Sequence, residues 1–402
     1  MKYDLLKKYY YEDKSTDKES YKTVYLRRLD KGIKLDFDIN GYPAFYNEDI
    51  EIFKTIIAIQ RTHEKIIDLA FKLPNIALDQ YARRCLIDEI ILTNDIEGVY
   101  STRREIGSIL SDLEKKNQKN RFFGLVNKYK MLNEYQVIDL RTSQDVRNLY
   151  DELFYQEILA EDPEDLPDGK IFRAKTVNVT DATQRVLHEG LMPEEEIIRA
   201  MDKALDILNN QDTDLIIRTA LFHYMFGYIH PFYEGNGRLS RFISSYMLTQ
   251  AFHPLTGYKL SYVIKEDLTH YYKAFRECND KRNRGDLTPF ILMFTEVLKR
   301  MCSEIYEDLE QRYKDMAILS SYIPQLTNDE QMRSLYYVLL QASLFSEEGI
   351  PTSTLLEISK VSRPTLIKRL GEIEKKGLLK KQMIEKTKYY QLDLNGMSAI
   401  TR

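Results

Sequence analysis

One short stretch of the chain, residues 230–241, combines a base, an acid, two glycines and two arginines. His230 is of the residue type that exchanges a proton most readily near neutral pH. The two glycines allow successive backbone N–H groups to turn toward a bound anion. Arg238 and Arg241 can each donate charge-assisted hydrogen bonds to phosphate oxygens. This combination predicts a turn that binds a polyphosphate.

A carboxylate within this basic turn indicates a second ligand. Glu234 is the one acidic residue of the stretch, and a carboxylate beside phosphates usually shares a divalent cation with them. Mg²⁺ is the natural candidate. A neutral imidazole at His230 can then accept a proton from a nucleophile that attacks the bound phosphate.

Helices must position this turn, because apolar residues repeat at steps of three and four on both sides of it. The pattern runs from Ile216 to Tyr228 and resumes from Leu239 to Met247, which predicts two helices around a short loop. A helix that begins near Arg238 would point its positive N-terminal end at the same anion.

The stretch resembles the signature of the Fic family, His-Pro-Phe-x-(Asp/Glu)-Gly-Asn-Gly-Arg-x-x-Arg, at every fixed position. The resemblance implies a mainly α fold and a nucleotidyltransferase that moves AMP from ATP to a protein hydroxyl, a protein adenylyltransferase. It also implies roles for individual residues: general base for His230, metal ligand for Glu234, phosphate cradle for Gly235, Asn236 and Gly237, and outer phosphate ligands for Arg238 and Arg241. A plain helix–helix turn is the alternative, but it needs neither the acid nor the last arginine.

A second motif concerns regulation. Residues 93–98, Thr-Asn-Asp-Ile-Glu-Gly, resemble the inhibitory motif (Ser/Thr)-x-x-x-Glu-(Gly/Asn) of Fic proteins, here N-terminal to the core as in class II. The resemblance implies that Glu97 pairs with Arg241, where it would take the place of the γ-phosphate of ATP. The alternative, compatible with this one, is that Gly98 ends a helix at its C′ position while Thr102 and Glu105 cap the next.

Further segments carry the same resemblance. Residues 169–187, with alternation at Val177–Val179 and then Arg185, Val186 and Leu187, predict a small hairpin similar to the Fic flap. Such an edge can pair with an extended protein substrate by strand addition. The segment 270–275 resembles a closing helix of the fold, and Tyr271 or Tyr272 is a candidate for contact with adenine, although aromatic residues at helical spacing more often belong to the core.

Composition limits the other chemistry. Three dispersed cysteines favour a reducing compartment over a zinc site or a disulfide framework. The N-terminus is too charged for a signal peptide, and no apolar run approaches the roughly 20 residues of a membrane span. We therefore expect a cytoplasmic protein without a membrane partner. The remaining histidines show no ligand spacing and are expected to be structural or surface residues.

The pattern along the chain predicts four regions. These are an N-terminal helical region at 1–120 that carries the inhibitory motif and begins with a helical extension at 1–40, a Fic-like core at 121–300, a helical linker at 301–330, and a winged helix-turn-helix at 331–402. The last region holds 12 Lys and Arg against 7 Asp and Glu, although the whole chain has a net charge of −4.

The C-terminal region shows helices at 332–345, 353–360 and 363–376, followed by strands at 378–383 and 388–392, and resembles a winged helix-turn-helix. The predicted recognition helix offers Arg363, Lys368 and Arg369, and the wing offers four lysines (Lys380, Lys381, Lys386 and Lys388). These cations suit phosphate contacts with DNA. Glu372 and Glu374 on the same helix equally suit a protein-docking or dimerisation module.

Three functions remain open at this stage. The first is an ATP- and Mg²⁺-dependent protein adenylyltransferase that Glu97 inhibits and that a change of oligomeric state, such as forming or breaking a homodimer, could release. The second is a hydrolase that removes AMP from a modified protein and uses Glu97 as a catalytic group. The third is a DNA-binding regulator whose Fic-like core senses nucleotide, which leaves His230 without a purpose.

Overall fold

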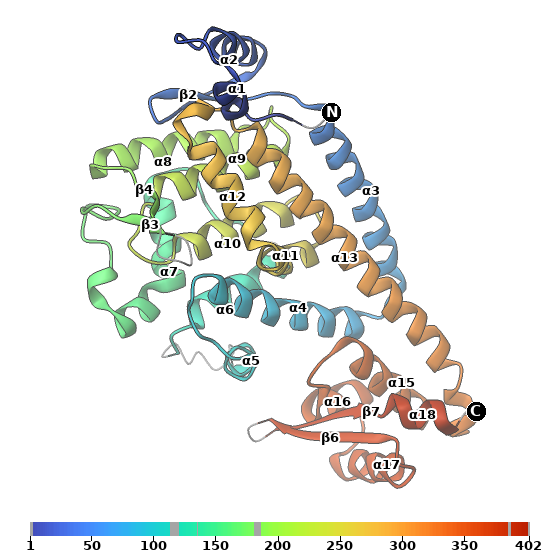
Figure 1. Ribbon diagram of the computed structural model, residues 1–402. Coiled ribbons are helices and arrows are strands. Elements are labelled where there is room, and N and C mark those ends of the chain that lie inside the picture. The colour runs from blue at the N-terminus through green and yellow to red at the C-terminus, as the bar shows by residue number, and fades with distance from the viewer. Residues whose placement is uncertain (1–2, 113–119, 135, 181–185, 385–386, 401–402) are drawn as a thin grey trace. The chain divides into compact units, whose positions relative to one another are not determined.

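The computed structural model describes residues 3–112, 120–134, 136–180, 186–384 and 387–400, which form mainly helices with a few short strands (Figure 1). The chain divides into two compact units. Unit 1 comprises Met1–Thr62 and Asp88–Ser303, and unit 2 comprises His63–Ile87 and Glu304–Arg402. The predicted mainly α fold is confirmed.

The units do not follow the predicted regions. Three helices contain unit boundaries, namely α3 (Ile50–Lys72), α4 (Asn75–Ile96) and α13 (Thr288–Ser320). The predicted linker at 301–330 consists of the rest of α13 followed by α14 (Ile323–Leu326). Nothing interrupts the helical pattern at 300, since the first proline after Pro289 is Pro324. Unit 1 therefore holds the Fic-like core together with the N-terminal region apart from residues 63–87.

Unit 1 is a helical assembly around α9 (Leu215–Ile229) and α10 (Asn236–Thr249), the two helices predicted around the short loop. Both are buried over most of their length. Helix α8 packs on α9, and α9 packs on α10 (Figure 1). The other helices that lie within this unit are α1 (Leu6–Glu12), α2 (Glu19–Lys31), α5 (Arg103–Asp112), α6 (Phe123–Met131), α7 (Ser143–Glu161), α8 (Glu194–Asn209), α11 (Leu260–Glu266) and α12 (Leu268–Asn279).

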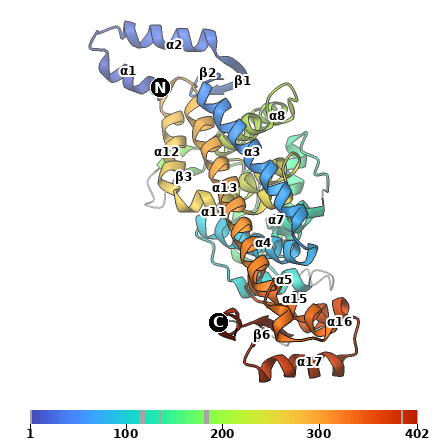
Figure 2. The same ribbon diagram turned by 90° about the vertical axis from the view of Figure 1, so that its right-hand side faces the viewer.

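Aromatic side chains join α12 to the first turns of α13, which run beside each other in Figures 1 and 2. The rings of Phe275 and Phe290 meet edge to face with centroids 4.7 Å apart. Short 3₁₀ turns connect several of these helices, at Leu132–Glu134, Pro163–Asp165, Pro254–Tyr258 and Lys281–Asn283.

The N-terminal extension is not entirely helical, which corrects the prediction for residues 1–40. After α1 and α2 the chain forms a hairpin of β1 (Ile33–Ile39) and β2 (Tyr42–Tyr46). The strand was legible in the alternation of Ile33-Lys34-Leu35-Asp36-Phe37-Asp38-Ile39. Asn40 and Gly41 form the turn with φ of 53° and 79°, as the two-residue hairpin turn with positive φ at both positions requires.

The predicted flap is present as an antiparallel hairpin of β3 (Asn178–Thr180) and β4 (Val186–Glu189). Asn178 pairs with Glu189, and Val179 pairs with His188. Arg185, which the prediction included, lies outside the described residues. The hairpin confirms the period-two pattern that predicted it.

The end of α4 confirms the capping prediction. Gly98 has a φ of 78°, its N–H donates to the Asp95 carbonyl, and the Val99 N–H donates to the Asn94 carbonyl. This pair of bonds is the Schellman arrangement that favours glycine. Helix α5 then begins after Thr102, whose hydroxyl accepts from the Glu105 N–H at 3.2 Å.

Unit 2 contains the C-terminal elements that the sequence predicted, within one or two residues: α15 (Glu330–Phe345), α16 (Thr352–Ser359), α17 (Arg363–Lys375), β6 (Leu379–Ile384) and β7 (Thr387–Leu392) (Figures 1 and 2). Two elements were not predicted, the short strand β5 (Ile350–Pro351) and α18 (Leu394–Ile400). The three strands form an antiparallel sheet in the order β5-β7-β6.

The described residues also bear on membrane-spanning helices and on the cysteines. None of the described helices is long and apolar enough to cross a membrane. The three cysteines, Cys85, Cys278 and Cys302, are free and buried.

Candidate active site

The loop between α9 and α10 depends on two residues with left-handed backbone. His230 ends α9 with φ 52° and ψ 64°, and Gly235 precedes α10 with φ 82° and ψ 2°. Glycine adopts this region without steric cost, whereas a histidine there is strained and requires support from its surroundings. Helix α10 begins at Asn236, two residues earlier than predicted, so its N-terminal turn faces the loop.

Phe232 anchors this loop in the core. Its ring is fully buried, and it stacks on Tyr150 with ring centroids 3.7 Å apart. The Asn236 side chain braces the same residue, because its Nδ2 donates to the Phe232 carbonyl at 2.8 Å and its Oδ1 accepts from the Phe232 N–H at 3.0 Å. The oxygen and one of the two Nδ2 donors of the Asn236 amide are thus engaged with the loop itself.

Arg173 supports the strained backbone of His230. This guanidinium is fully buried, and its Nε donates to the His230 carbonyl at 2.8 Å. Its other donors reach the carbonyls of Lys175 and Leu191 at 2.7 and 2.9 Å. Sequence reasoning missed this role, since carbonyl acceptors from three separate segments leave no local pattern.

The imidazole of His230 is held neutral. Burial lowers its pKa to about 4, and the nearby Arg173 contributes in the same direction, whereas Glu97 opposes them. Within the described part of the chain, its buried Nδ1 has no hydrogen-bond partner. A neutral imidazole is the form that can accept a proton.

Glu97 forms the ion pair with Arg241 that the resemblance implies. Arg241 Nη2 donates to Glu97 Oε1 at 2.8 Å. The same guanidinium donates from Nε to the Thr93 hydroxyl at 2.8 Å and from Nη2 to the Thr93 carbonyl at 3.0 Å. Arg241 therefore satisfies a backbone carbonyl in the last turn of α4, where a cation also interacts favourably with the helix dipole.

Gly237 leaves the space in which this carboxylate lies. A Cβ built on Gly237 would fall 2.0 Å from Glu97 Oε1 and 3.1 Å from Arg241 Nη1. Contacts that short do not occur in proteins, so any side chain at 237 would displace Glu97. Because Gly237 has no side chain, another group can come close to the first turn of α10. Phosphate-binding loops require glycine for the same reason.

The Arg238 guanidinium contacts buried protein groups. It is fully buried and forms an ion pair with Glu157, which is buried as well. It also donates to Asn94 Oδ1 at 3.4 Å and lies 3.5 Å from Glu234 Oε1. The structure does not bring this side chain to the cavity described next. Glu157, on α7, was absent from the sequence prediction because its partner is 81 residues away.

A cavity of about 260 Å³ brings together the other predicted residues except Gly235, which does not line it. His230, Glu234, Asn236, Gly237 and Arg241 line it together with Glu97, Tyr271 and Tyr272. Tyr271 is nearly buried and bonds through its hydroxyl to His223 Nε2 at 2.7 Å. His188 and Asn178 of the flap also line this cavity, although the sequence marked His188 as structural.

The segment that contains this loop matches a known protein family. Residues 140–248, which hold the loop and most of α7 to α10, match the model of the Fic/DOC family. This chain carries a Fic domain. A solved Fic family protein from Desulfovibrio desulfuricans shares the fold with a TM-score of 0.52 at 18% identity, over 87% of this chain and 98% of that chain.

Curated relatives of the Fic domain include two named Protein adenylyltransferase Fic. The one from Drosophila willistoni is 30% identical over 123 residues, which are 31% of this chain and 22% of that protein. The one from Nematostella vectensis is 30% identical over 109 residues, which are 26% of this chain and 23% of that protein. The matches thus cover less than a quarter of each relative's length.

Glu234 is the residue of the Fic domain that fits a metal ion. Its side chain is 41% exposed, and burial together with the neighbouring Glu97 raises its pKa while Arg238 lowers it. Among the described residues no group of three metal-ligating side chains exists. A single carboxylate fits Mg²⁺, which keeps several waters and is commonly shared with substrate phosphates, better than it fits Ca²⁺ or Zn²⁺.

Proposed function

We propose that this chain is a protein adenylyltransferase, which transfers AMP from ATP to a hydroxyl side chain of a protein, and that Glu97 restrains it. One observation carries the proposal. A neutral, partly buried His230 and the cation Arg241 line the same cavity, and the Glu97 carboxylate forms an ion pair with that cation beside Gly237. The named relatives support the same reaction class.

The reaction requires one proton acceptor and one leaving group. The acceptor hydroxyl oxygen forms a bond to the α-phosphorus of ATP, the bond from that phosphorus to the bridging oxygen breaks, and pyrophosphate leaves. The hydroxyl proton passes to the neutral imidazole of His230. Glu234 would hold Mg²⁺ when it is bound, and the ion would supply charge neutralisation for the leaving group.

Restraint follows from competition for one guanidinium. Arg241 can bind the terminal phosphate of ATP only when the Glu97 carboxylate moves away from the guanidinium. The carboxylate and the phosphate are both anions that accept from the N–H groups of Arg241. ATP bound without this contact would present its α-phosphorus in a pose unsuited to attack by an incoming hydroxyl. Movement of Glu97 thus becomes the step that permits transfer.

The protein substrate is proposed to dock at the flap. Asn178 of β3 and His188 of β4 both line the cavity, so a segment that adds to this two-stranded sheet would lie beside His230. Strand addition fixes the main chain and leaves the side chain free to reach the cavity.

Removal of AMP from a modified protein is the competing activity. Glu97 lines the same cavity as His230, with 28% of its side chain exposed. A carboxylate at that position can activate water for attack on phosphorus. In this case Glu97 is needed for catalysis, and its loss lowers activity.

Unit 2 is proposed to contact duplex DNA as a second function. A cavity lies between α16, α17 and β7, and its lining includes Arg363 and Lys388. Other predicted contacts are engaged within the unit, because Lys380 pairs with Asp393, Lys381 pairs with Glu374, and Arg369 bonds to Gln331. Lys386 lies outside the described residues. The cations left for phosphates are therefore few.

Labelled ATP tests the enzymatic proposal. In the Glu97→Gly background, ATP labelled at the α-phosphate should label protein and ATP labelled at the γ-phosphate should not. A further His230→Ala change should abolish labelling while ATP binding, measured by calorimetry, persists, because the imidazole handles a proton and not the phosphates. Transfer of the γ-label would indicate a kinase, and persistent α-label without His230 would exclude its role as base.

A further inference from the structure

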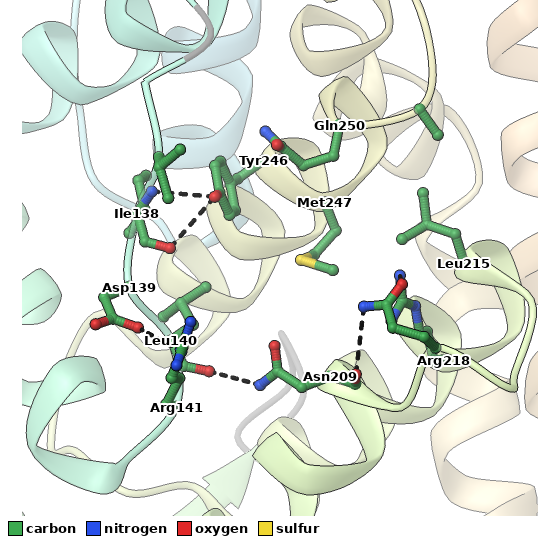
Figure 3. Close-up of a pocket in the computed structure, with 13 residues that line it drawn as sticks. Ile138, Asp139, Leu140, Arg141, Asn209, Leu215, Arg218, Tyr246, Met247 and Gln250 are labelled. Carbon is green, nitrogen blue, oxygen red and sulfur yellow. Dashed lines mark hydrogen bonds and ion pairs between the residues drawn. The ribbon is translucent and has the colours of Figure 1, made fainter.

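Unit 1 contains a second cavity besides the one that His230 lines. It has a volume of about 490 Å³ and lies at the C-terminal end of α10, and the two cavities share no lining residue (Figure 3). Its buried cation, Arg218, already donates to the Asn210 carbonyl at 3.2 Å and to Gln211 Oε1 at 3.3 Å. Because Arg218 is engaged within the protein, we place the nucleotide of the proposed reaction in the cavity of His230.

The cavity of His230 extends along helix α12, since Tyr271, Phe275 and Asn279 of this helix all line it. Burial raises the pKa of the Tyr271 hydroxyl and the nearby Arg241 lowers it, so this end of the helix lies beside the phosphate-binding arginine. Asn279 is eight residues further along α12, a distance of about 12 Å. When phosphates bind Arg241, the base of the nucleotide is expected toward Asn279.

Two hydrogen bonds hold Asn279 in place. Its side-chain Oδ1 accepts from the buried Tyr224 hydroxyl at 2.6 Å, and its backbone carbonyl accepts from Asn40 Nδ2 at 2.8 Å. Asn279 is the last residue of α12, so its carbonyl belongs to the helix-end acceptors that need a partner outside the helix. The bond from Tyr224 occupies the amide oxygen, and Nδ2 is the part of this amide that can donate to a ligand.

Asn40 also supports the flap side of the cavity. Its backbone N–H donates to the Tyr228 hydroxyl at 2.9 Å. The ring of Tyr228 stacks on His188 of β4 with centroids 4.5 Å apart, and the Tyr228 carbonyl accepts from His188 Nε2 at 2.7 Å. His188 lines the cavity, as Asn279 does. One residue therefore supports a lining residue of α12 and, through Tyr228, a lining residue of the flap.

The turn between β1 and β2 gives Asn40 a defined position. Asn40 has a φ of 53° and is followed by Gly41 with a φ of 79°, and asparagine is one of the few residue types that adopt this region readily. The turn lies outside residues 140–248, which match the Fic/DOC model. The N-terminal hairpin is thus a separate part of the chain that reaches the residues around the cavity.

We propose that Asn40 is a positioning residue for the nucleotide base. It fixes Asn279 directly and His188 through Tyr228, and both residues line the cavity at which the base binds. A binding site keeps its geometry when hydrogen bonds from behind hold the residues that contact the ligand. This inference rests on the proposed function, because it takes ATP as the substrate.

Calorimetry with ATP and Mg²⁺ tests this role in a Glu97→Gly parent, in which Glu97 no longer pairs with Arg241. Asn40→Gly preserves the turn, because glycine adopts positive φ without cost, and deletes the bond to Asn279. This variant should raise the Kd for ATP about three- to tenfold, the effect of one hydrogen bond. Tripolyphosphate, which has no base, should show no difference between the parent and Asn40→Gly.

Two further variants separate positioning from stability. Asp36→Gly changes an exposed residue of β1 in the same hairpin, and it should bind ATP as the parent does even where its melting temperature falls. Asn40→Asp keeps the shape of the side chain but lacks the donor. It should weaken ATP binding at least as much as Asn40→Gly does.

Equal Kd values for ATP in the parent and both Asn40 variants would overturn the positioning role. Equal weakening by Asp36→Gly, or a matching change for tripolyphosphate, would overturn it as well. A parent that binds ATP but transfers no label would contradict the adenylyltransferase proposal alone, and the Kd values would still decide the role of Asn40. A parent that binds no ATP at millimolar concentration would overturn both proposals.

Discussion

At the scale of single residues, the site depends on how neighbours hold His230. Its backbone lies in the left-handed region, and its partly buried imidazole lies near Arg173. The two facts have one origin, since the carbonyl of His230 accepts from Arg173 while the same cation lowers the imidazole pKa. Position and protonation state of the base are therefore set together.

The first prediction concerns Arg173 as a positioning residue. In an active Glu97→Gly background, Arg173→Met should lower kcat by about 100-fold, because small displacements of a reacting group have effects of this order. The KM for ATP should change little, since Arg173 does not line the cavity. The exposed Lys175→Met is the control and should leave kcat unchanged. An equal rise in KM without loss of kcat would indicate a role in binding instead.

The protonation state of His230 can be measured directly. Its folded pKa, about 4, lies below the value near 6.5 expected in the unfolded chain. Protonation therefore makes unfolding more favourable as pH falls from about 6.5 toward 4, and the neutral form persists at all higher pH. The ring-proton resonance of His230, assigned with His230→Ala, should not titrate between pH 8 and about 5.5. A midpoint near 6.5 would contradict the neutral form of His230 that the proposal requires.

At the scale of elements, helix α4 and helix α10 meet through their ends. Thr93 and Glu97 at the end of α4 bind Arg241, and Asn94 contacts Arg238. Gly237 permits this approach, because it has no side chain where the carboxylate lies. The proposed restraint would thus involve the last turn of one helix and the first two turns of another.

A double-mutant cycle tests this contact. Gly237→Ala should destabilise the wild type by about 1–3 kcal/mol, as overpacking typically does. In the Glu97→Gly background only the 3.1 Å approach to Arg241 Nη1 remains, and the same change should destabilise the protein by less than about 1 kcal/mol, because the helix preference of alanine over glycine offsets part of that contact. Urea unfolding of the four proteins measures the coupling. Equal effects of Gly237→Ala in both backgrounds would show that Glu97 does not occupy this space.

Most of these elements were legible in the sequence, and the exceptions have physical reasons. The flanking helices, the flap and the end of α4 followed from periodicity and capping residues. The hairpin of β1 and β2 was missed although its alternation was present, because the flanking charged, tyrosine-rich segment favoured helix. The burial of Arg238 could not be predicted, since it depends on Glu157, whose position becomes known only when α7 folds against α10.

At the scale of the whole molecule, the chain combines an acidic body with a basic C-terminal region, and the two units carry separate proposals. Unit 1 holds the Fic cavity, and unit 2 holds the C-terminal helices and sheet. The net charge of −4 disfavours association with DNA over the chain as a whole. Contact with DNA therefore depends on a few local cations of unit 2.

This limited charge gives a prediction for unit 2. Contacts from Arg363, Lys368 and Lys388 would give a slope of about −3 for log K against log salt on duplex DNA. Fluorescence anisotropy over a salt series measures the slope, and Lys368→Gln should reduce its magnitude by about one. Lys381→Gln is the control, because Lys381 is already paired with Glu374. Failure to bind duplex DNA at low salt would leave unit 2 as a protein-interaction module.

The most direct test of the account compares the wild type with Glu97→Gly for transfer of label from α-labelled ATP and Mg²⁺ to protein. Asp95→Gly is the matched control, since Asp95 is an exposed acid of the same helix turn that pairs with Lys265. The account predicts that Glu97→Gly raises transfer at least about tenfold, because release of Arg241 restores a phosphate contact worth more than 1.4 kcal/mol, and that Asp95→Gly resembles the wild type. Unchanged or lower transfer by folded Glu97→Gly would contradict the restraint and favour removal of AMP as the activity of this site.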